Sequence, residues 1–530
     1  MAISQEAYKA LEAVVGPAYI SQDPVECIAY NMDKGGFEAG TGFCKVMVKT
    51  PGCIIHPRTA EEVQKIVRIC NRYQVAYKVG SSFWIVQSFA LTEDCLIIDL
   101  KCMNKMEIDE KHMYATVEPG VIYSQLQELA MKHGLYTTTP GGGSQVSVIP
   151  NHLYAGLSPL NYRNSYAPRR ILGGEWILPD GEIVRFGSLA TQDDPFWGEG
   201  LGPDLVGAMR MWHGGLGIVT KMAVKLFPFQ PERPEPVGIS PDTGLALPPR
   251  RMRWLNFTLP DRDSLARAMR EIANAEIAAA VTKVPVFWRA IAKAKTKEDF
   301  WAIWSRETED SIKNTHILRV LLIGYTSEDQ MDYEERILMD IVREFGGEGR
   351  RTKPTDESWI KNADSAGMWL MTGGYVSVEY ILESLQHCIR LGETIANFKS
   401  QFDLPLMPDY NDPGWFQLTD LGHMGYVEFL VYWDPFEKEE EVQKIDRWYI
   451  AELPKELIRK RFYQWVGATI KPIGLTGPHY GPNYHEFMLR VKRAIDPANL
   501  SAPPTPLERD VYVEKAEWLH SVVDWDAPKL

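Results

Sequence analysis

The stretch HGGLGIVTKM, residues 213–222, decides the fold together with four other segments that occur in a fixed order. The set alternates apolar, strand-like runs with glycines, which let a backbone approach a ligand closely. The other four are DLKCMNK from Asp99, ATVEPGVIYSQLQELA from Ala115, DPFWGEGLGPD from Asp194 and HYGPNYHEFMLRVKRAIDPANL from His479. The last segment is about half a chain away from the others. This layout predicts one ligand-binding domain that is interrupted by another domain.

The composition indicates a globular protein with more than one packed unit. A single hydrophobic core rarely supports 530 residues. The chain is 45% hydrophobic and 24% charged, as is usual for globular proteins. The formal net charge is -13 and no basic run is present, which argues against a nucleic acid partner.

Neither a membrane span nor a metal site is expected. No window approaches the roughly 18 continuous apolar residues of a spanning helix. The start, MAISQEAYKALEAVVG, predicts a short amphipathic helix and lacks the features of an export signal. The seven cysteines have no metal-site spacing, which fits reduced thiols. We therefore expect a cytoplasmic protein without structural zinc.

Local patterns in the first part alternate between strand and helix. A capping box at residues 59–62 predicts the start of a helix with a buried apolar face. A second helix is expected from Tyr123, with Gly134 at its C-terminal end. Residues 174–187 have the form of a hairpin whose turn contains Pro179 and Gly181. These patterns predict an α+β or α/β unit.

A Pro-rich stretch at residues 230–250 predicts the first domain boundary. Beyond it, strand-like and acidic helical segments alternate, which predicts an α+β unit with an antiparallel sheet. We predict that the first domain returns near residue 456. The predicted units are 1–235 and 456–505 for the two parts of the first domain, 236–455 for the inserted domain and 506–530 for a tail.

The five segments, in this order, resemble the vanillyl-alcohol oxidase and p-cresol methylhydroxylase family of FAD-linked oxidoreductases. The resemblance covers roughly residues 50–230 and 478–503. It implies an α+β fold in which a two-part FAD-binding domain is interrupted by a cap domain. It also implies FAD as the cofactor, bound in an extended form.

The resemblance further implies which residues bind FAD. Backbone amides in turns supply anion donors without bulky side chains. The residues around Gly80 would face the pyrophosphate, two further loops would lead to the flavin ring, and the segment after Leu216 would contact the ring or the ribityl chain. The implied set is Gly80, Ser81, Ser82, Glu118, Pro119, Gly120, Pro140, Gly141, Gly142, Gly143, Gly217, Ile218 and Val219.

Two departures from the family pattern bear on function. The loop after Gly80 contains Phe83, Trp84, Ile85 and Val86, and bulky or β-branched residues do not readily take positive φ. Either this loop takes another path around FAD, or FAD binds weakly or not at all. The Tyr-Arg pair that stabilises a phenolate in phenol-oxidising members is also missing at the aligned positions, 466–467. A para-substituted phenol is therefore unsupported as substrate.

Candidate catalytic side chains come from three parts of the chain. His213 precedes the glycines that are expected near the flavin, and His423 is the best candidate for covalent flavin attachment. The polar segment 152–170 offers Tyr162 and Arg163 for an anionic substrate group. Tyr480 comes from the returning segment. Each of these residues also has an ordinary structural interpretation, as a turn, core or solvated side chain.

The leading functional hypothesis is an FAD-dependent oxidoreductase that transfers a hydride from a small organic substrate to flavin N5. An aromatic alcohol, an alkylphenol-like compound and a 2-hydroxy acid all remain open as substrates. A partner subunit that retained the fold without the cofactor is the alternative, and non-redox chemistry in the same pocket is a third. An electron-acceptor protein or partner subunit and a homo-oligomer are the expected protein partners.

Overall fold

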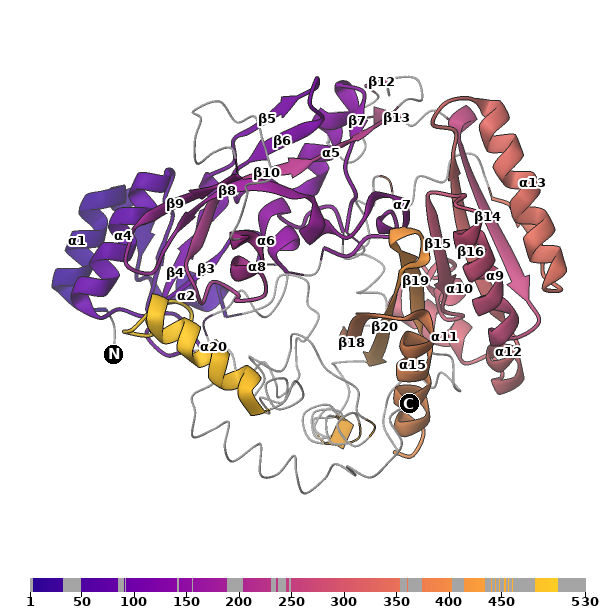
Figure 1. Cartoon of the computed structure of the whole chain (residues 1–530). Helices are drawn as coiled ribbons and strands as arrows, with labels where there is room; N and C mark the ends of the chain where they lie inside the picture. Colours follow the sequence, from indigo (N-terminus) through magenta and orange to yellow (C-terminus); the bar gives the residue numbers. More distant parts are fainter. Residues whose placement is uncertain are drawn as a thin grey trace.

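The structure is a computed structural model in which three larger sheets divide the chain. It describes residues 3–31, 49–83, 90, 92–140, 143–154, 156–187, 204–229, 235–236, 245–246, 249–352, 360, 374–402, 414–433, 440, 444, 448, 452–453, 456, 460 and 482–503. Figure 1 shows two of the sheets packed together on one side of the molecule and the third on the other side.

The first sheet contains a parallel strand–helix–strand unit near the N-terminus. Its strand order is β1-β2-β4-β3, with β2, β4 and β3 parallel. Helix α4 connects β2 to β3 and buries its apolar face on the sheet, while Thr59 caps its first turn through the amide of Glu62. The elements are α1 (Gln5–Val15), β1 (Ile20–Ser21), α2 (Pro24–Ala29), β2 (Cys53–Ile55), α4 (Ala60–Tyr73), β3 (Tyr77–Gly80) and β4 (Leu96–Asp99).

The second sheet is antiparallel and follows directly in the chain. Strand β10 lies at its centre, between β6 and β8. The strands are β5 (Met106–Asp109), β6 (Tyr114–Val117), β8 (Ile171–Ile177), β9 (Ile183–Phe186) and β10 (Ile218–Lys225), and the helices are α5 (Tyr123–Lys132), α6 (Val148–Leu153), α7 (Asn161–Asn164) and α8 (Leu205–Met209). The short pair β7 (Leu135–Tyr136) and β11 (Phe227–Pro228) lies outside this sheet.

The third sheet is also antiparallel, and helices α9, α13 and α15 share its main apolar core. Its strand order among the described residues is β17-β14-β16-β15-β19-β20-β18. The strands are β14 (Met252–Leu259), β15 (Ala280–Val284), β16 (His316–Ile323), β17 (Glu348–Arg351), β18 (Gly374–Glu383), β19 (Trp415–Thr419) and β20 (Met424–Trp433). The helices are α9 (Arg262–Asn274), α10 (Trp288–Ile291), α11 (Lys297–Trp304), α12 (Glu309–Lys313), α13 (Glu328–Glu344) and α15 (Leu385–Lys399).

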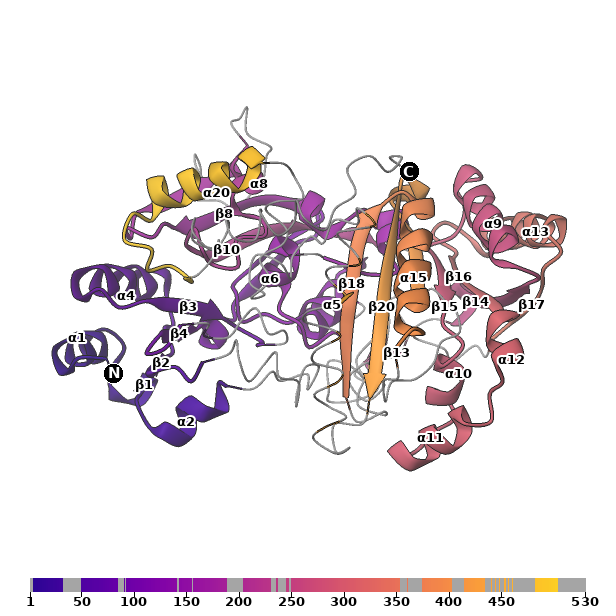
Figure 2. The same ribbon diagram turned by 90° about the horizontal axis from the view of Figure 1, so that it is seen from below.

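The C-terminal helix α20 (Pro482–Ile495) returns to the first two sheets, as Figure 2 shows. The chain that follows it extends the first sheet at β3. Tyr77 donates its amide to the carbonyl of Leu500 at 2.8 Å and accepts the amide of Ala502 at 2.7 Å. Residues more than 400 positions apart are therefore hydrogen-bonded neighbours.

The predicted elements agree with the structure where local chemistry decides them. The helix after Thr59, the hairpin at 174–187 and the antiparallel sheet of the second part are confirmed. Gly134 has φ +69°, which fits its place just beyond α5. The predicted boundaries at residues 455 and 505 lie outside the described residues, so the division into domains stays a prediction.

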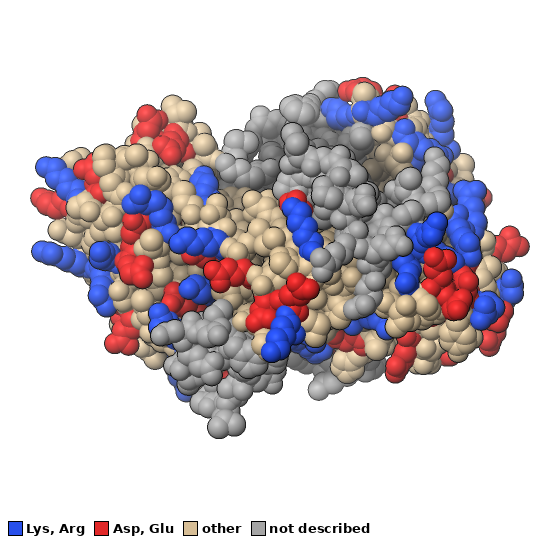
Figure 3. All heavy atoms as spheres, turned by 90° about the horizontal axis from the view of Figure 1, so that it is seen from above, with Lys and Arg blue, Asp and Glu red and all other residues tan. Residues whose placement is uncertain are grey.

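The surface carries both charge signs. On the face in Figure 3, Lys and Arg are intermixed with Asp and Glu over most of the visible area. Among the described residues, none of the helices is both long enough and apolar enough to cross a membrane.

Candidate functional site

The glycine turn, residues 213–217, is held by side chains from both ends of the sequence. Lys78 of β3 donates to the carbonyl of His213 at 2.7 Å. Ser501 donates to the carbonyl of Gly214 at 2.6 Å, and Lys492 of α20 donates to that of Gly215 at 2.6 Å. Three consecutive carbonyls of the turn therefore bind groups from β3 and from the C-terminal segment. These contacts fix the backbone where β10 begins.

Lys492 is the centre of this junction and is fully partnered. Its ammonium binds the carboxylate of Asp496 at 2.7 Å and the carbonyl of Ser501 at 2.6 Å, besides Gly215. The side chains of Lys492 and Asp496 are 4% and 1% exposed. Asp496 also accepts the amides of Leu500 and Ser501. A buried ion pair with this many hydrogen bonds holds one geometry.

Gly217 is required by the packing of the turn itself. Its φ is +116°, and a Cβ there would lie 2.3 Å from the carbonyl oxygen of Ile177 in β8. Gly120 has a comparable reason, because its Cβ would meet the carbonyl of Lys101 at 2.5 Å. Both predicted cofactor-binding glycines thus have a structural role within the protein.

The loop after β3 begins under a buried aromatic ring. Phe83 is 3% exposed, has φ +49° and lies so close to Gly80 that a Cβ on the glycine would be 2.5 Å from the ring. The predicted pyrophosphate loop therefore carries a bulky residue in a strained backbone conformation. Trp84, Ile85 and Val86 lie outside the described residues.

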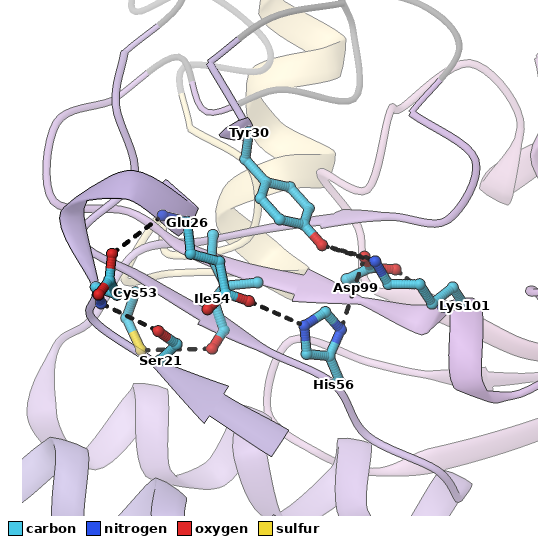
Figure 4. Close-up of polar contacts among 9 residues, drawn as sticks. Ser21, Glu26, Tyr30, Cys53, Ile54, His56, Asp99 and Lys101 are labelled. Atoms are coloured by element: carbon cyan, nitrogen blue, oxygen red, sulfur yellow. Dashed lines mark hydrogen bonds and ion pairs between the residues drawn. The ribbon is translucent and has the colours of Figure 1, made fainter. Parts of the chain in front are cut away.

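A polar cluster fixes the strand next to this loop (Figure 4). Asp99 pairs with Gly80 in the register of β3 and β4. Its buried carboxylate accepts the hydroxyl of Tyr30 at 2.6 Å and the ammonium of Lys101 at 2.8 Å. Burial and the Asp99 charge raise the pKa of Tyr30, so its hydroxyl stays protonated and donates. The cluster anchors the backbone at which the loop starts.

Backbone contacts bring the other predicted cofactor loops together. Ser147 donates its amide to the hydroxyl of Ser82 at 3.3 Å and forms a bridge with Ile122. The amide of Met211 donates to the carbonyl of Leu153 at the end of α6. The loop after β3, the loop before α6 and the approach to the glycine turn are therefore joined through α6.

Several buried polar atoms on these loops have no hydrogen-bond partner. They are the hydroxyls of Ser81, Thr137, Thr138 and Ser147 and the Nε2 atom of His213. Buried polar atoms are nearly always paired with protein, water or ligand. Of these residues, Ser81 belongs to the predicted cofactor set, and the others lie within a few residues of it in the sequence, so unmatched hydrogen-bonding groups lie at or near the predicted cofactor segments in the described part of the chain.

His213 is held neutral by its surroundings. Burial, followed by the charge of Lys78, lowers the pKa of His213 to about 3. Its ring lies edge-on to Tyr154, with the centroids 5.2 Å apart, and its backbone φ is +50°. Burial likewise lowers the pKa of Lys78 to about 7. At neutral pH the ring is a hydrogen-bonding group without charge.

The structure separates the other predicted catalytic residues. Tyr162 is buried in the core of the third sheet, where its hydroxyl donates to the carbonyl of Ile272 at 3.3 Å. Arg163 is exposed and lies over the ring of Tyr325. His423 is exposed on the turn between β19 and β20. Tyr480 lies outside the described residues, so no common catalytic cluster is formed by the residues in view.

The remaining predicted cofactor residues occupy loops and a strand start. The Glu118 carboxylate accepts the amide of Lys105 at 2.9 Å, ahead of Pro119. Ile218 and Val219 begin β10 and pair with Ile177 and Trp176 of β8. Gly143 has φ +114° beyond Pro140, while Gly141 and Gly142 lie outside the described residues. Within the described chain, no group of three His, Cys, Asp or Glu could hold a metal ion.

Sequence reasoning missed the residues that assemble this junction. Lys492 lies in α20 and Asp496 directly follows the helix, and this four-residue spacing indicates an ion pair. Nothing in that spacing indicates burial. Lys78 gives a sequence signal for the junction, because it lies in an otherwise apolar strand and a buried charge needs a partner.

Comparison with known proteins tests the family resemblance. Residues 51–187 match the FAD binding domain family. The chain is 23% identical over 485 residues to the flavoprotein subunit of 4-cresol dehydrogenase [hydroxylating] from Pseudomonas putida. This match covers 86% of this chain and 87% of that protein. These matches agree with the vanillyl-alcohol oxidase and p-cresol methylhydroxylase family. The resemblance inferred from the five segments is confirmed.

Solved structures confirm the fold. A p-cresol methylhydroxylase structure with substrate bound superposes with a TM-score of 0.73 at 18% identity, covering 95% of this chain and 97% of that chain. The 4-ethylphenol oxidase of Gulosibacter chungangensis gives a TM-score of 0.69 at 18% identity, covering 95% of this chain and 98% of that chain.

Other relatives match over the first part alone. A glycolate oxidase subunit of Bacillus subtilis is 32% identical over 183 residues, which are 34% of this chain and 37% of that protein. The mitochondrial D-lactate dehydrogenase [cytochrome] of Arabidopsis thaliana is 25% identical over 182 residues, 34% of this chain and 31% of that protein. The chain thus spans about a third of the length of these relatives.

Proposed function

We propose that this protein is an FAD-dependent oxidoreductase that oxidises a small aromatic or hydroxy-acid substrate. The observation that carries the proposal is the set of buried hydroxyls without a hydrogen-bond partner among the described residues, on the loop after β3, the segment after β7 and the loop before α6. A long, polar cofactor offers matching donors and acceptors for these atoms. FAD, when bound, supplies the acceptor for a hydride from a substrate C–H bond.

Named residues of this chain would hold the cofactor. The hydroxyls of Ser81 and Ser147 would hydrogen-bond it from the loop after β3 and from the loop before α6. Thr137 and Thr138 would do so from the segment after β7. The contacts of Lys78, Ser501 and Lys492 hold the glycine turn in place without touching the reacting atoms. The loop after β3 would take another path than in glycine-rich members, because Phe83 lies over Gly80.

The two candidate histidines would have different roles. A pKa of about 3 leaves His213 uncharged at neutral pH, so it would orient a ligand by hydrogen bonding rather than store a proton. His423 remains the proposed site of covalent attachment. Tyr162 would support the contact between α7 and the third sheet, whereas Arg163 and Tyr480 remain candidates for contact with the substrate.

Protein partners and location are parts of the same proposal. The 4-cresol dehydrogenase relative is a flavoprotein subunit, which supports an electron-accepting protein or subunit as partner here. We also propose a homo-oligomer and a cytoplasmic location. The six described cysteines are free thiols, as expected in a reducing compartment.

An absorption spectrum of the purified protein tests the proposal. We expect flavin bands in the visible region, and bands that remain with the protein after acid precipitation would locate a covalent flavin. A Ser81→Ala, Ser147→Ala variant should bind FAD about thirtyfold more weakly, since each of the two lost hydrogen bonds contributes on the order of 1 kcal/mol. Ser264→Ala, at a buried serine of α9, is the matched control and should bind FAD like the wild type.

Protein that remains colourless and takes up no added FAD would overturn the oxidoreductase proposal. That outcome would favour the alternative, a partner subunit that keeps the fold without the cofactor. The aromatic ring of Phe83 over Gly80 is the observation on which this alternative rests.

A further inference from the structure

Arg170 is a buried cation without a hydrogen-bond or ion-pair partner among the described residues. It ends the short helix η4 (Ala167–Arg170), before β8, and is 1% exposed. Its Nε, Nη1 and Nη2 atoms have no hydrogen-bond partner. The ring of Phe227, with its centroid 6.0 Å from the guanidinium carbon, is an aromatic neighbour. An arginine in such surroundings normally binds a carboxylate or phosphate.

The carboxylate that could neutralise Arg170 is bound to its neighbour. Asp420, on the turn between β19 and β20, forms an ion pair with Arg169. Arg169 is half exposed, whereas the Arg170 side chain points into the protein. Two consecutive arginines thus have opposite situations, one paired at the surface and one buried and unpaired.

His152 provides a second unmatched group beside Arg170. It is fully buried on α6, and its Nδ1 lies 2.9 Å from the carbonyl of Val148 and 3.0 Å from the hydroxyl of Tyr123. A carbonyl only accepts, and Tyr123 donates its own proton to Asn151, so Nδ1 carries the hydrogen. Nε2 is then an acceptor, and no hydrogen-bond donor reaches it from the part of the chain that the structure describes.

The charge state of His152 supports this assignment. Burial, followed by the charge of Arg170, lowers the pKa of His152 to about 3. The ring is therefore neutral at neutral pH and does not act as a second cation. One permanent positive charge and one neutral acceptor match a monoanion with a donor group better than a phosphate dianion.

We propose that Arg170 and His152 form a binding site for a monocarboxylate that carries a hydroxyl near its carboxylate. The guanidinium binds the carboxylate, and Nε2 of His152 accepts the hydroxyl proton in a hydrogen bond. The Val148 carbonyl, which accepts from Nδ1, holds the imidazole in the required tautomer, and the Tyr123 hydroxyl supports it. Helix α6 links this site to the flavin side, because Ser147 precedes the helix and Tyr154 follows it against His213. That this site binds the substrate of the oxidation rests on the proposed function.

Calorimetric titration of the purified protein tests the site. The probes are mandelate and lactate, with mandelamide and lactamide as neutral analogues, phenylacetate and propionate as analogues without the hydroxyl, and inorganic phosphate. We expect at least one hydroxy acid to bind and its amide to bind at least tenfold more weakly. Arg170→Met should weaken binding of the acid at least about tenfold, because a charge-assisted hydrogen bond is lost.

Arg169→Met is the matched control, since it removes the adjacent, surface-paired arginine. Arg169→Met should bind the hydroxy acid with an affinity within about twofold of the wild type. Arg170→Lys should recover part of the affinity that Arg170→Met loses. The site would be overturned if wild type and Arg170→Met bound the acid equally well, or if the acid and its amide bound equally well. Tighter binding of phosphate than of the acids, or no binding of either acid, would also overturn it.

The flavin content of the same samples separates the two proposals. Arg170-dependent binding in protein that takes up no flavin would remove the proposed oxidation and leave the carboxylate site. Flavin-containing protein without Arg170-dependent binding would remove the site alone.

Discussion

Two buried cations show how differently this protein treats charge in two regions. Lys492, where the C-terminal helix meets the glycine turn, binds one carboxylate and two carbonyls. Arg170, just before β8, has no hydrogen-bond partner within the described residues for any of its three nitrogens. Both side chains are almost inaccessible to solvent.

The difference distinguishes a structural charge from a functional one. A buried cation with matched partners holds two segments in register, and its loss leaves the partners unpaired. A buried cation without partners destabilises the protein until a ligand supplies the anion. The first kind of residue should therefore matter for folding and the second for binding.

Lys492→Met should give the largest loss of stability. The substitution leaves the carboxylate of Asp496 buried without its cation and frees the carbonyls of Gly215 and Ser501. We expect the free energy of unfolding to fall by about 3–5 kcal/mol, measured by urea denaturation. Lys132→Met is the control, because Lys132 forms an exposed pair with Glu128 at the same four-residue spacing. It should change stability by at most about 0.5 kcal/mol.

Gly217→Ala should have the next largest effect. The new Cβ would lie 2.3 Å from the carbonyl oxygen of Ile177 at a φ of +116°. We expect a loss of about 2–3 kcal/mol in the same assay. Gly134→Ala also places a side chain at positive φ, but no atom lies within 4 Å of that Cβ. Gly134→Ala should lower the free energy of unfolding by about 1 kcal/mol. Equal losses of stability in Gly217→Ala and Gly134→Ala would refute the steric explanation.

Lys78→Met should change the pH dependence of stability. Burial lowers the pKa of Lys78 from 10.5 to about 7, so the unfolded chain binds more protons between these values. The wild type should therefore gain about 1–2 kcal/mol relative to the variant between pH 7 and 8.5. Urea unfolding curves of both proteins across this range measure the gain. A difference that stays constant or shrinks as the pH rises would show that Lys78 is fully charged in the folded protein.

The sequence predicts the elements whose causes are local. Thr59 caps its helix through a residue three positions away, and the turn of the 174–187 hairpin is formed by its own residues. The order of glycine-containing segments also predicts the fold and the family resemblance. Such features need no knowledge of distant residues.

Contacts between distant residues account for what the sequence does not predict. Lys78 binds a carbonyl 135 positions away, and Ser501 binds one 287 positions away. Arg169 and Arg170 are chemically identical neighbours, and only the packed structure determines which of them is buried. For the same reason, Tyr162 was predicted to contact an anionic substrate and instead lies in the core of the third sheet.

The unfolding free energy of Arg170→Met without added ligand tests the central claim most directly. If Arg170 is paired only when an anionic ligand is bound, replacing it with an apolar side chain of similar length should leave the ligand-free protein as stable as the wild type or more stable. A loss of about 3 kcal/mol or more, as expected for Lys492→Met, would show that Arg170 is a structural charge and would contradict the account.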